Sequence, residues 1–182
     1  MTELEICEGL QAGDNKCRKE FYTLTSGKLL TIGCRYLNDR ELAEDILHDT
    51  YIQIFNSASK FVYREEGSLI AWAKKVMVNK CLDFIRKNAK VDNIPIETIG
   101  ETIEDNEEYA EQIPPEVLLK LIGELPTGYR TVLNLFIFEG LTHKEIAEKL
   151  GINEKSSSSQ FFRAKSLLAK KLKDYLKFKK YE

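Results

Sequence analysis

The chain of 182 residues is 43% hydrophobic and 31% charged, with a formal net charge of −2, a balance that excludes a disordered chain and is typical of one large or two small soluble domains. No apolar run approaches the roughly 18–20 residues of a membrane helix, and the N-terminus has no basic patch before an apolar core, so we expect no membrane insertion, no secretory signal and a cytoplasmic location. Four widely spaced cysteines and two histidines offer no zinc-ligand spacing, so we expect reduced, packed thiols and neither a metal nor a cofactor.

The first half of the chain has helical periodicity throughout. A short helix from about residue 4 ends at Gly13, and Asp14 can cap a helix that runs to about residue 37. We expect further helices at 40–56 and, capped by Ser68, at 69–88, with a loop at 57–67 between them. One side of the 40–56 helix is apolar, with Ala43, Ile46, Leu47 and Ile54. Since no segment alternates with period two, the sequence predicts an all-α fold without strands.

The opposite side of the 40–56 helix combines acids with two large apolar side chains. It holds Glu41, Asp45, His48, Ile52 and Phe55, with Glu44 and Asp49 nearby. Apolar groups among acids are typical of a protein-binding patch. The alternative is a charged surface on which Ile52 and Phe55 are partly covered.

The 69–88 helix also has two different sides. Its apolar stripe comprises Ile70, Ala73, Met77, Cys81, Phe84 and Ile85. The other side holds Trp72, Val76, Asn79, Asp83 and Arg86, with Lys80 and Lys87 beside it. An aromatic side chain among amides and bases suits stacking on unpaired nucleotides and holding their backbone. The alternative is that Trp72, the only tryptophan, packs under another helix.

An acidic stretch divides the chain. Residues 96–115 carry seven acids and no base, whereas residues 1–95 balance 14 bases with 14 acids and residues 116–182 carry 13 bases against eight acids. The sequence therefore predicts two small helical domains, at 1–93 and 115–182, joined by an acidic linker at 94–114. The basic C-terminal part suits nucleic acid or a solvated surface, and charge alone does not choose between them.

The most specific motif lies at residues 140–165, GLTHKEIAEKLGINEKSSSSQFFRAK. Thr142 and Glu145 form a capping box, Gly151 permits a left-handed turn residue, and Asn153 caps the next helix. Short helices with a tight turn and the small Ala147 four residues before the glycine are typical of a helix-turn-helix, with a plain helical hairpin as the alternative. The helices expected in this half span 116–124, 127–138, 142–150 and 153–177.

The last of these helices has an outer face of hydroxyls and bases. At 100° per residue, its core side holds Ser157, Phe161, Ala164 and Leu168. The outer side holds Ser156, Ser159, Arg163, Ser166 and Lys170, with Lys155 at its flank. Small side chains let a helix backbone approach a DNA groove, and an arginine reaches a phosphate or a guanine edge. A solvated surface is the alternative, especially for the lysines.

Four segments together resemble a known family: ELAEDILHDTYIQIF at 41–55, WAKKVMVNKCLDFIRK at 72–87, LPTGYRTVLNLFIFEGLTHKEIAEKLGI at 125–152 and SQFFRAKSLL at 159–168. Their order and spacing are similar to those of bacterial RNA polymerase sigma factors, in the extracytoplasmic-function (ECF) group of the sigma-70 family. This group keeps only the second and fourth sigma domains. The style of the recognition helix, with its Ser-Gln pair, is similar to members from Bacteroidetes.

The resemblance implies a role for each matched position. Asp45, His48, Asp49 and Ile52 match the surface that docks on the clamp helices of the polymerase, although relatives usually have Gln where His48 stands. Trp72, Asn79, Lys80, Asp83 and Arg86, with the loop before Ser68, match the region that opens and reads the −10 element. Lys155, Ser156, Ser159 and Arg163 match the helix that reads the −35 element. Relatives often have a base at Ser158 and an aliphatic residue at Ser157.

The resemblance further implies that core RNA polymerase, promoter DNA and an anti-sigma factor are the partners, and that the protein is not an enzyme. The linker is then either a spacer kept extended by self-repulsion or a segment that occupies a basic channel of the polymerase. Three other classes remain open: a one-component helix-turn-helix regulator, a helical enzyme and a protein-binding module. The first needs a ligand pocket or dimer interface, and the second needs a cluster of catalytic groups; neither feature is visible in the sequence.

Overall fold

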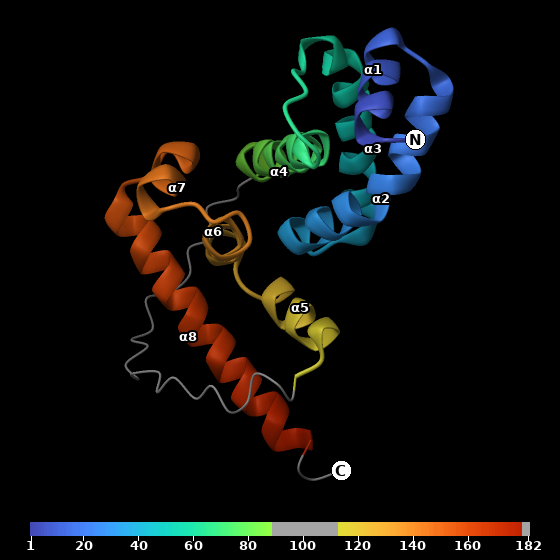
Figure 1. The fold of residues 1–182 in the computed structure, drawn as a ribbon. Coiled ribbons are helices and arrows are strands. Elements are labelled where there is room, and N and C mark those ends of the chain that lie inside the picture. The colour runs from blue at the N-terminus through green and yellow to red at the C-terminus, as the bar shows by residue number, and fades with distance from the viewer. Residues whose placement is uncertain (89–112, 180–182) are drawn as a thin grey trace. The chain divides into compact units, whose positions relative to one another are not determined.

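The computed structural model describes residues 1–88 and 113–179, and within these ranges every regular element is a helix and none is a strand (Figure 1). This confirms the predicted all-α fold. The chain divides into two compact units, Met1–Ala89 and Lys90–Glu182, and each is considered by itself. The predicted acidic linker at 94–114 lies outside the described residues except for its last two positions.

The first unit contains α1 (Glu3–Ala12), α2 (Asn15–Leu37), α3 (Arg40–Ser57), the short 3-10 helix η1 (Ala58–Lys60) and α4 (Ser68–Asn88). Local caps begin the first three helices: the side chains of Thr2, Asp14 and Asp39 each accept a backbone N–H three residues ahead. The helices therefore begin within a residue or so of where the sequence predicts them. The predicted loop at 57–67 is wrong only in that η1 occupies its start.

Ser68 does not cap α4, contrary to the sequence prediction. It is the first helical residue, and its hydroxyl accepts from the Arg64 N–H at 3.5 Å. The free N–H groups at this helix start are bonded instead by Glu3 of α1, whose carboxylate accepts from Gly67 and Leu69 at 2.7 Å each. Sequence rules for caps look three residues ahead, so they cannot find a partner that is 64 residues away.

The core of the first unit is apolar and closely packed. Helices α2, α3 and α4 pack against one another, and Phe21, Leu29 and Tyr36 of α2, Ile54 of α3 and Met77 of α4 have no exposed surface. The predicted apolar stripe of α3 is confirmed, because Ala43, Ile46, Leu47 and Ile54 are all buried. In α2, Gly33 is required by close approach: a Cβ at this position would lie 2.6 Å from Met77 Cε and 3.0 Å from Ala43 Cβ.

The apolar side of α4 is wider than predicted. Val76, which the sequence places on the polar side, is buried, as are Val78 and Leu82. The reason is that α4 packs against both α2 and α3, so two neighbours cover it where one stripe was expected.

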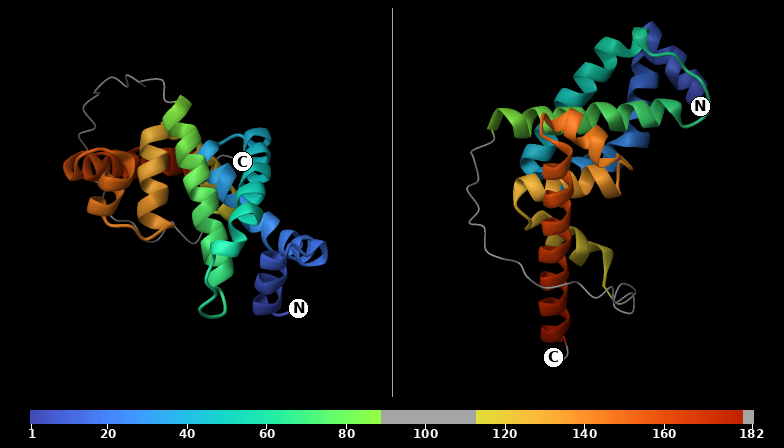
Figure 2. Two further views of the ribbon diagram at one scale, coloured as in Figure 1. Left: turned by 90° about the horizontal axis from the view of Figure 1, so that it is seen from above. Right: turned by 90° about the vertical axis from the view of Figure 1, so that its left-hand side faces the viewer.

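The second unit contains α5 (Pro115–Gly123), α6 (Thr127–Ile137), α7 (His143–Leu150) and α8 (Glu154–Lys179), close to the four predicted ranges. The 26-residue α8 packs against the other three helices (Figure 2). A core cluster of this unit has Ile122, Leu125, Leu133 and Ala164 at its centre and Leu118, Tyr129, Phe161, Leu167 and Leu168 around them. Val132, Leu135 and Ile146 are also fully buried.

The cysteines of the described residues are all free thiols, and three of them are buried: Cys7, Cys17 and Cys81. Burial raises the pKa of Cys81 to about 12, so this thiol stays protonated and unreactive. No helix in residues 1–88 or 113–179 is long and apolar enough to span a bilayer.

Candidate nucleic-acid and protein interfaces

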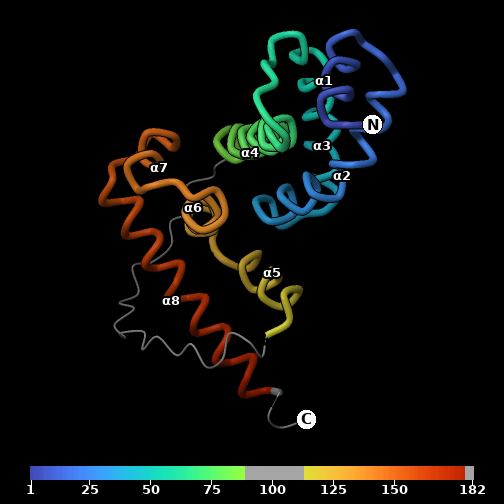
Figure 3. Tube along the Cα trace, in the orientation of Figure 1, coloured from blue at the N-terminus to red at the C-terminus, as the bar shows by residue number. Residues whose placement is uncertain are grey.

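Helices α7 and α8, with the turn between them, form a helix-turn-helix (Figure 3). Every cap predicted for it is in place. Glu145 N–H donates to Thr142 Oγ1 at 3.3 Å, and Thr142 N–H donates to the Glu145 carboxylate at 2.8 Å. The Thr142 N–H, together with the Thr142 hydroxyl that donates to the same carboxylate at 2.8 Å, holds the pKa of Glu145 below its usual range. Gly151 ends α7 at φ +68°, where a side chain would be strained, and Asn153 Oδ1 accepts from Ser156 N–H at 2.7 Å.

The start of α8 is fixed to α7 by a polar and aromatic contact. Ser157 is fully buried, and its Oγ lies 3.0 Å from Nδ1 of His143. The His143 ring stacks on Phe136 of α6 at 4.7 Å, and Phe136 in turn lies 4.4 Å from Phe161. The serine at this core position, where relatives often have an aliphatic residue, therefore has a polar partner in the adjacent helix.

The outward face of α8 is confirmed as a surface at its first turns. Lys155 and Ser159 are exposed, and Ser156 and Arg163 are half-buried. Arg163 Nη1 donates to the Tyr129 hydroxyl at 3.4 Å, so α6 helps to orient the guanidinium. Ser166 was wrongly predicted to face outward: it is buried, on a helix that packs against α5, α6 and α7. Phe162, 56% exposed beside Arg163, was not singled out by the sequence pattern, since an isolated apolar residue on a surface is common.

The polar side of α4 is partly exposed and partly covered. Trp72 is half-buried and stacks on Phe61 of the segment before α4, with ring centroids 4.8 Å apart. That segment therefore covers part of the Trp72 ring. Asp83 and Arg86 form an exposed ion pair at 3.3 Å, and Asn79 and Lys80 are half-buried one turn earlier.

The acidic side of α3 is exposed as predicted. Asp45, His48 and Asp49 are exposed, and Ile52 among them exposes 59% of its surface. Phe55 is half-buried, because Arg18 of α2 lies over its ring at 5.4 Å and Tyr51 lies beside it at 5.7 Å. Ile52 is therefore the large apolar side chain that this surface leaves in water.

No group of three or more potential metal-ligating side chains occurs in the described part of the chain. The expectation that the protein needs neither a metal nor a cofactor stays a prediction.

Comparison with known proteins matches both units to one family. Residues 21–91 match the model of Sigma-70 region 2, and residues 116–168 match that of Sigma-70, region 4, so that together they cover more than half of the chain. The chain is 28% identical over 133 residues to RNA polymerase sigma factor SigV of Bacillus subtilis, which covers 73% of this chain and 77% of that protein. It is 22% identical over 185 residues to RNA polymerase sigma-H factor of Pseudomonas aeruginosa, covering 95% of each.

Further relatives are named as ECF sigma factors. The ECF RNA polymerase sigma-E factor of Haemophilus influenzae is 20% identical over 185 residues, covering 94% of this chain and 96% of that one. Among solved structures, that of CnrH in complex with the cytosolic domain of CnrY matches at 19% identity with a TM-score of 0.49, covering 93% and 96% of the two chains. The Bacteroidetes style of the recognition helix stays a prediction. The chain belongs to the sigma-70 family, and it is an ECF-type sigma factor that directs RNA polymerase to promoters.

Proposed function

We propose that this sigma factor divides its work among three surfaces. The exposed side of α3, with Asp45, His48, Asp49 and Ile52, docks on the clamp helices of the polymerase largest subunit. The polar side of α4 (Trp72, Asn79, Lys80, Asp83 and Arg86), with the segment before it, opens and reads the −10 element. The first turns of α8, with Lys155, Ser156, Ser159 and Arg163, read the −35 element.

One observation supports the α8 assignment above the rest. The helix start is capped by Asn153 and fixed from beneath by the buried Ser157, while Lys155 and Ser159 point into solvent. A groove-reading helix needs this combination, because small exposed side chains permit close approach while a fixed axis keeps each of them opposite one base pair. Arg163, held by the Tyr129 hydroxyl, is the side chain there with the reach for a base edge or a phosphate.

The α3 assignment is supported by exposure and charge. Ile52 lies in water with Asp45, His48 and Asp49 around it, and an apolar anchor with a charged rim is the usual composition of a protein-binding patch. We extend the proposal to a cytoplasmic, non-enzymatic protein with an anti-sigma factor partner that covers these same surfaces.

The −35 assignment is tested with Arg163→Ala in holoenzyme reconstituted from core RNA polymerase, on promoters recovered by transcribing a genomic library. If Arg163 reads a base edge, the substitution costs about 1–3 kcal/mol and relaxes preference at one position. If it contacts only phosphate, binding weakens on all sequences and the salt slope falls by about one. Lys173→Ala, which removes an exposed base further along α8, is the control. Equal transcription by wild type and the Arg163 variant would contradict both.

The docking assignment is tested with the double variant Asp45→Lys and Ile52→Lys. We expect weaker binding of core polymerase with unchanged helicity, because the variant removes the apolar anchor and inverts the charge. The matched control replaces an exposed acid and an exposed aliphatic residue of α2, Glu20 and Leu24, by lysine. Equal polymerase affinity in the two double variants would exclude this side of α3 as the docking surface.

A further inference from the structure

Helix α1 has no assigned role, since the match to region 2 begins only at residue 21. It is nevertheless firmly built into the first unit. Ile6, Cys7 and Leu10 are buried, and α1 packs against α2 and η1. Thr2 and Glu5 close a capping box at its start. A helix with such packing is a rigid base for any side chain that it presents.

The first such side chain is Glu3. Its Oε2 accepts from the N–H of Gly67 and its Oε1 from the N–H of Leu69, both at 2.7 Å. A carboxylate that accepts two backbone N–H groups at a helix start makes short, charge-assisted bonds and also lies at the positive end of the helix dipole. Glu3 thus fixes the point at which the chain enters α4.

The second is Gln11, near the other end of α1. Its Nε2 donates to the carbonyl oxygen of Phe61 at 2.9 Å. Phe61 is also the residue whose ring stacks on Trp72 of α4. The two side chains of α1 therefore hold the segment Phe61–Gly67 at its two ends, and this segment contains no helical or strand residue of its own.

We propose that α1 is a brace for the segment Phe61–Gly67, and that Glu3 and Gln11 are positioning residues that set this segment for reading the −10 element. The inference rests on the proposed role of α4 and the segment before it. Ordering an irregular segment costs conformational entropy for each residue. If α1 orders the segment before DNA binds, binding no longer includes that entropy cost. The difference in binding free energy between a base that fits the fixed segment and one that does not is then larger.

The test compares Glu3→Ala and Gln11→Glu with wild type. The first removes both acceptors; the second keeps the size of the side chain but replaces the donor by an oxygen facing the Phe61 carbonyl. Glu8→Ala, which removes an exposed acid from the same helix, is the matched control. Circular dichroism measures the helicity of each variant and so verifies that it is folded. If Glu3→Ala does not fold, Gln11→Glu still tests the proposal.

Two measurements on the free full-length chain report the brace itself. Amide hydrogen exchange at Gly67 and Leu69 should accelerate in Glu3→Ala. The emission of Trp72, the only tryptophan, should shift in both brace variants as its stack with Phe61 loosens, and it should not shift in Glu8→Ala. Glu3→Gln keeps one acceptor oxygen and should fall between wild type and Glu3→Ala.

A third measurement reports the consequence. With reconstituted holoenzyme and a promoter library randomised in the −10 element, discrimination between the preferred and other −10 sequences should fall about 3- to 10-fold in the brace variants, the size expected for loss of a hydrogen bond. Discrimination at the −35 element and affinity for core polymerase should not change. A general loss of stability would lower all three together, so the selective loss distinguishes positioning from folding.

Two results would overturn the inference. Unchanged exchange and unchanged Trp72 emission in both variants would show that α1 does not hold the segment. A shifted emission with unchanged −10 discrimination would show that holding the segment does not matter for reading. Asn79→Ala separates this from failure of the proposed function, since it should lower −10 discrimination with the brace intact; if it does not, the assignment of α4 itself is wrong.

Discussion

Different interactions stabilise the interior of each of the two units of this sigma factor. In the first unit the largest fully buried side chains are apolar or aromatic, such as Phe21, Tyr36 and Met77. The buried hydroxyls of Thr25 and Tyr51 satisfy one another at 2.7 Å. Apolar packing among the four helices is therefore the main support of this unit, beside the bonds of Glu3 at the start of α4.

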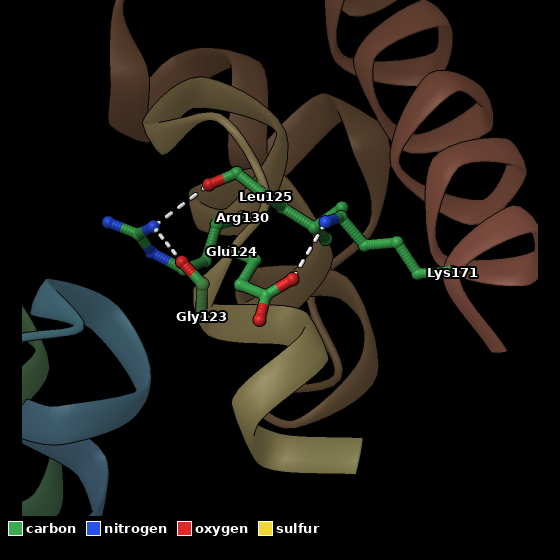
Figure 4. Close-up of polar contacts among 5 residues, drawn as sticks. All are labelled: Gly123, Glu124, Leu125, Arg130 and Lys171. Atoms are coloured by element: carbon green, nitrogen blue, oxygen red, sulfur yellow. Dashed lines mark hydrogen bonds and ion pairs between the residues drawn. The ribbon is translucent and has the colours of Figure 1, made fainter. Parts of the chain in front are cut away.

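The described part of the second unit has fewer buried apolar side chains than that of the first, and we expect it to depend more on directional bonds at helix ends. Arg130 is buried, and its Nη1 donates to the carbonyl oxygens of Gly123 at 2.7 Å and Leu125 at 2.9 Å (Figure 4). These two carbonyls belong to the turn between α5 and α6. Burial lowers the pKa of Arg130, which nevertheless remains a cation at neutral pH. Lys171 of α8 reaches Glu124 in the same turn at 2.7 Å.

The difference shows which substitutions each unit tolerates. An apolar core responds to lost volume and is insensitive to most surface charges. A unit held at its turns by a buried guanidinium and an ion pair responds to the loss of single polar atoms, because the carbonyls left behind lose their partners.

Phe21→Ala should have the largest effect and should be confined to the first unit. Removing a fully buried aromatic side chain costs about 3–5 kcal/mol. Denaturation followed by the emission of Trp72 reports this unit alone, because the chain has a single tryptophan. Leu24→Ala, at a side chain 45% exposed on the same helix, is the control and should cost less than about 1 kcal/mol. Parallel loss of amide protection in α5–α8 would show instead that the two units unfold together.

Arg130→Met should have the corresponding effect in the second unit. The two carbonyls of the α5–α6 turn lose their donor while the site stays buried, at a cost of about 2–4 kcal/mol. Amide exchange in α5, α6 and α8 should accelerate, and the Trp72 transition should not move. Arg130→Lys keeps one flexible donor, so its amide exchange rates should lie between those of wild type and Arg130→Met. An unchanged exchange pattern in Arg130→Met would mean that apolar packing alone holds this unit as well.

The sequence predicts the local features of both units well. The helices, the caps at Asp14, Thr142 and Asn153, and the helix-turn-helix follow from residues within four positions of one another, and the structure confirms them. Partners that are distant in the sequence do not follow. The sequence contains the acid at Glu3, but nothing local links it to the N-terminus of α4.

The same reason explains the errors on faces. A helical wheel assigns one inner and one outer side to each helix, and for α3 this assignment is correct. Val76 and Ser166 lie on helices with two or more neighbours, so their inner sides are wider than a single stripe. For the candidate interfaces, the sequence predicts which side chains of α3 and α8 reach solvent at the docking and recognition surfaces, but not that Phe61 covers Trp72 or that Tyr129 holds Arg163.

The contact between His143 and Ser157 should have a smaller effect. Ser157→Ala removes the hydrogen-bond partner of a half-buried ring nitrogen and should cost about 1 kcal/mol. His143→Phe keeps the aromatic stack on Phe136 but loses the same bond. In a double-mutant cycle, the double variant should cost less than the sum of the two single variants, with a coupling of about 0.5–1.5 kcal/mol. Strict additivity would show that α7 and α8 are joined by packing alone.

The smallest effect should come from the ion pair of Glu124 with Lys171, and it should depend on pH. The hydrogen bond from Lys171 is the main cause that holds the pKa of Glu124 below its ordinary value of 4.5. The unfolded chain therefore binds a proton more readily than the folded one in this range, so the pair stabilises the second unit above about pH 4.5 and loses its effect as the pH falls through the lowered pKa. Because the two side chains are 34% and 38% exposed, solvent and salt screen the pair, and we expect less than about 1 kcal/mol.

Lys171→Met tests this dependence against Lys170→Met, which removes the neighbouring exposed lysine. At neutral pH and low salt, amide exchange at the α5–α6 turn should be faster in Lys171→Met than in wild type, and the difference should shrink both at acid pH and in high salt. Lys170→Met should follow wild type throughout. A difference that persists at acid pH would mean that the methylene stem of Lys171 acts by covering apolar surface of α8 and not through its charge. The second unit would then resemble the first, and the contrast between apolar packing and directional bonds would rest on Arg130 alone.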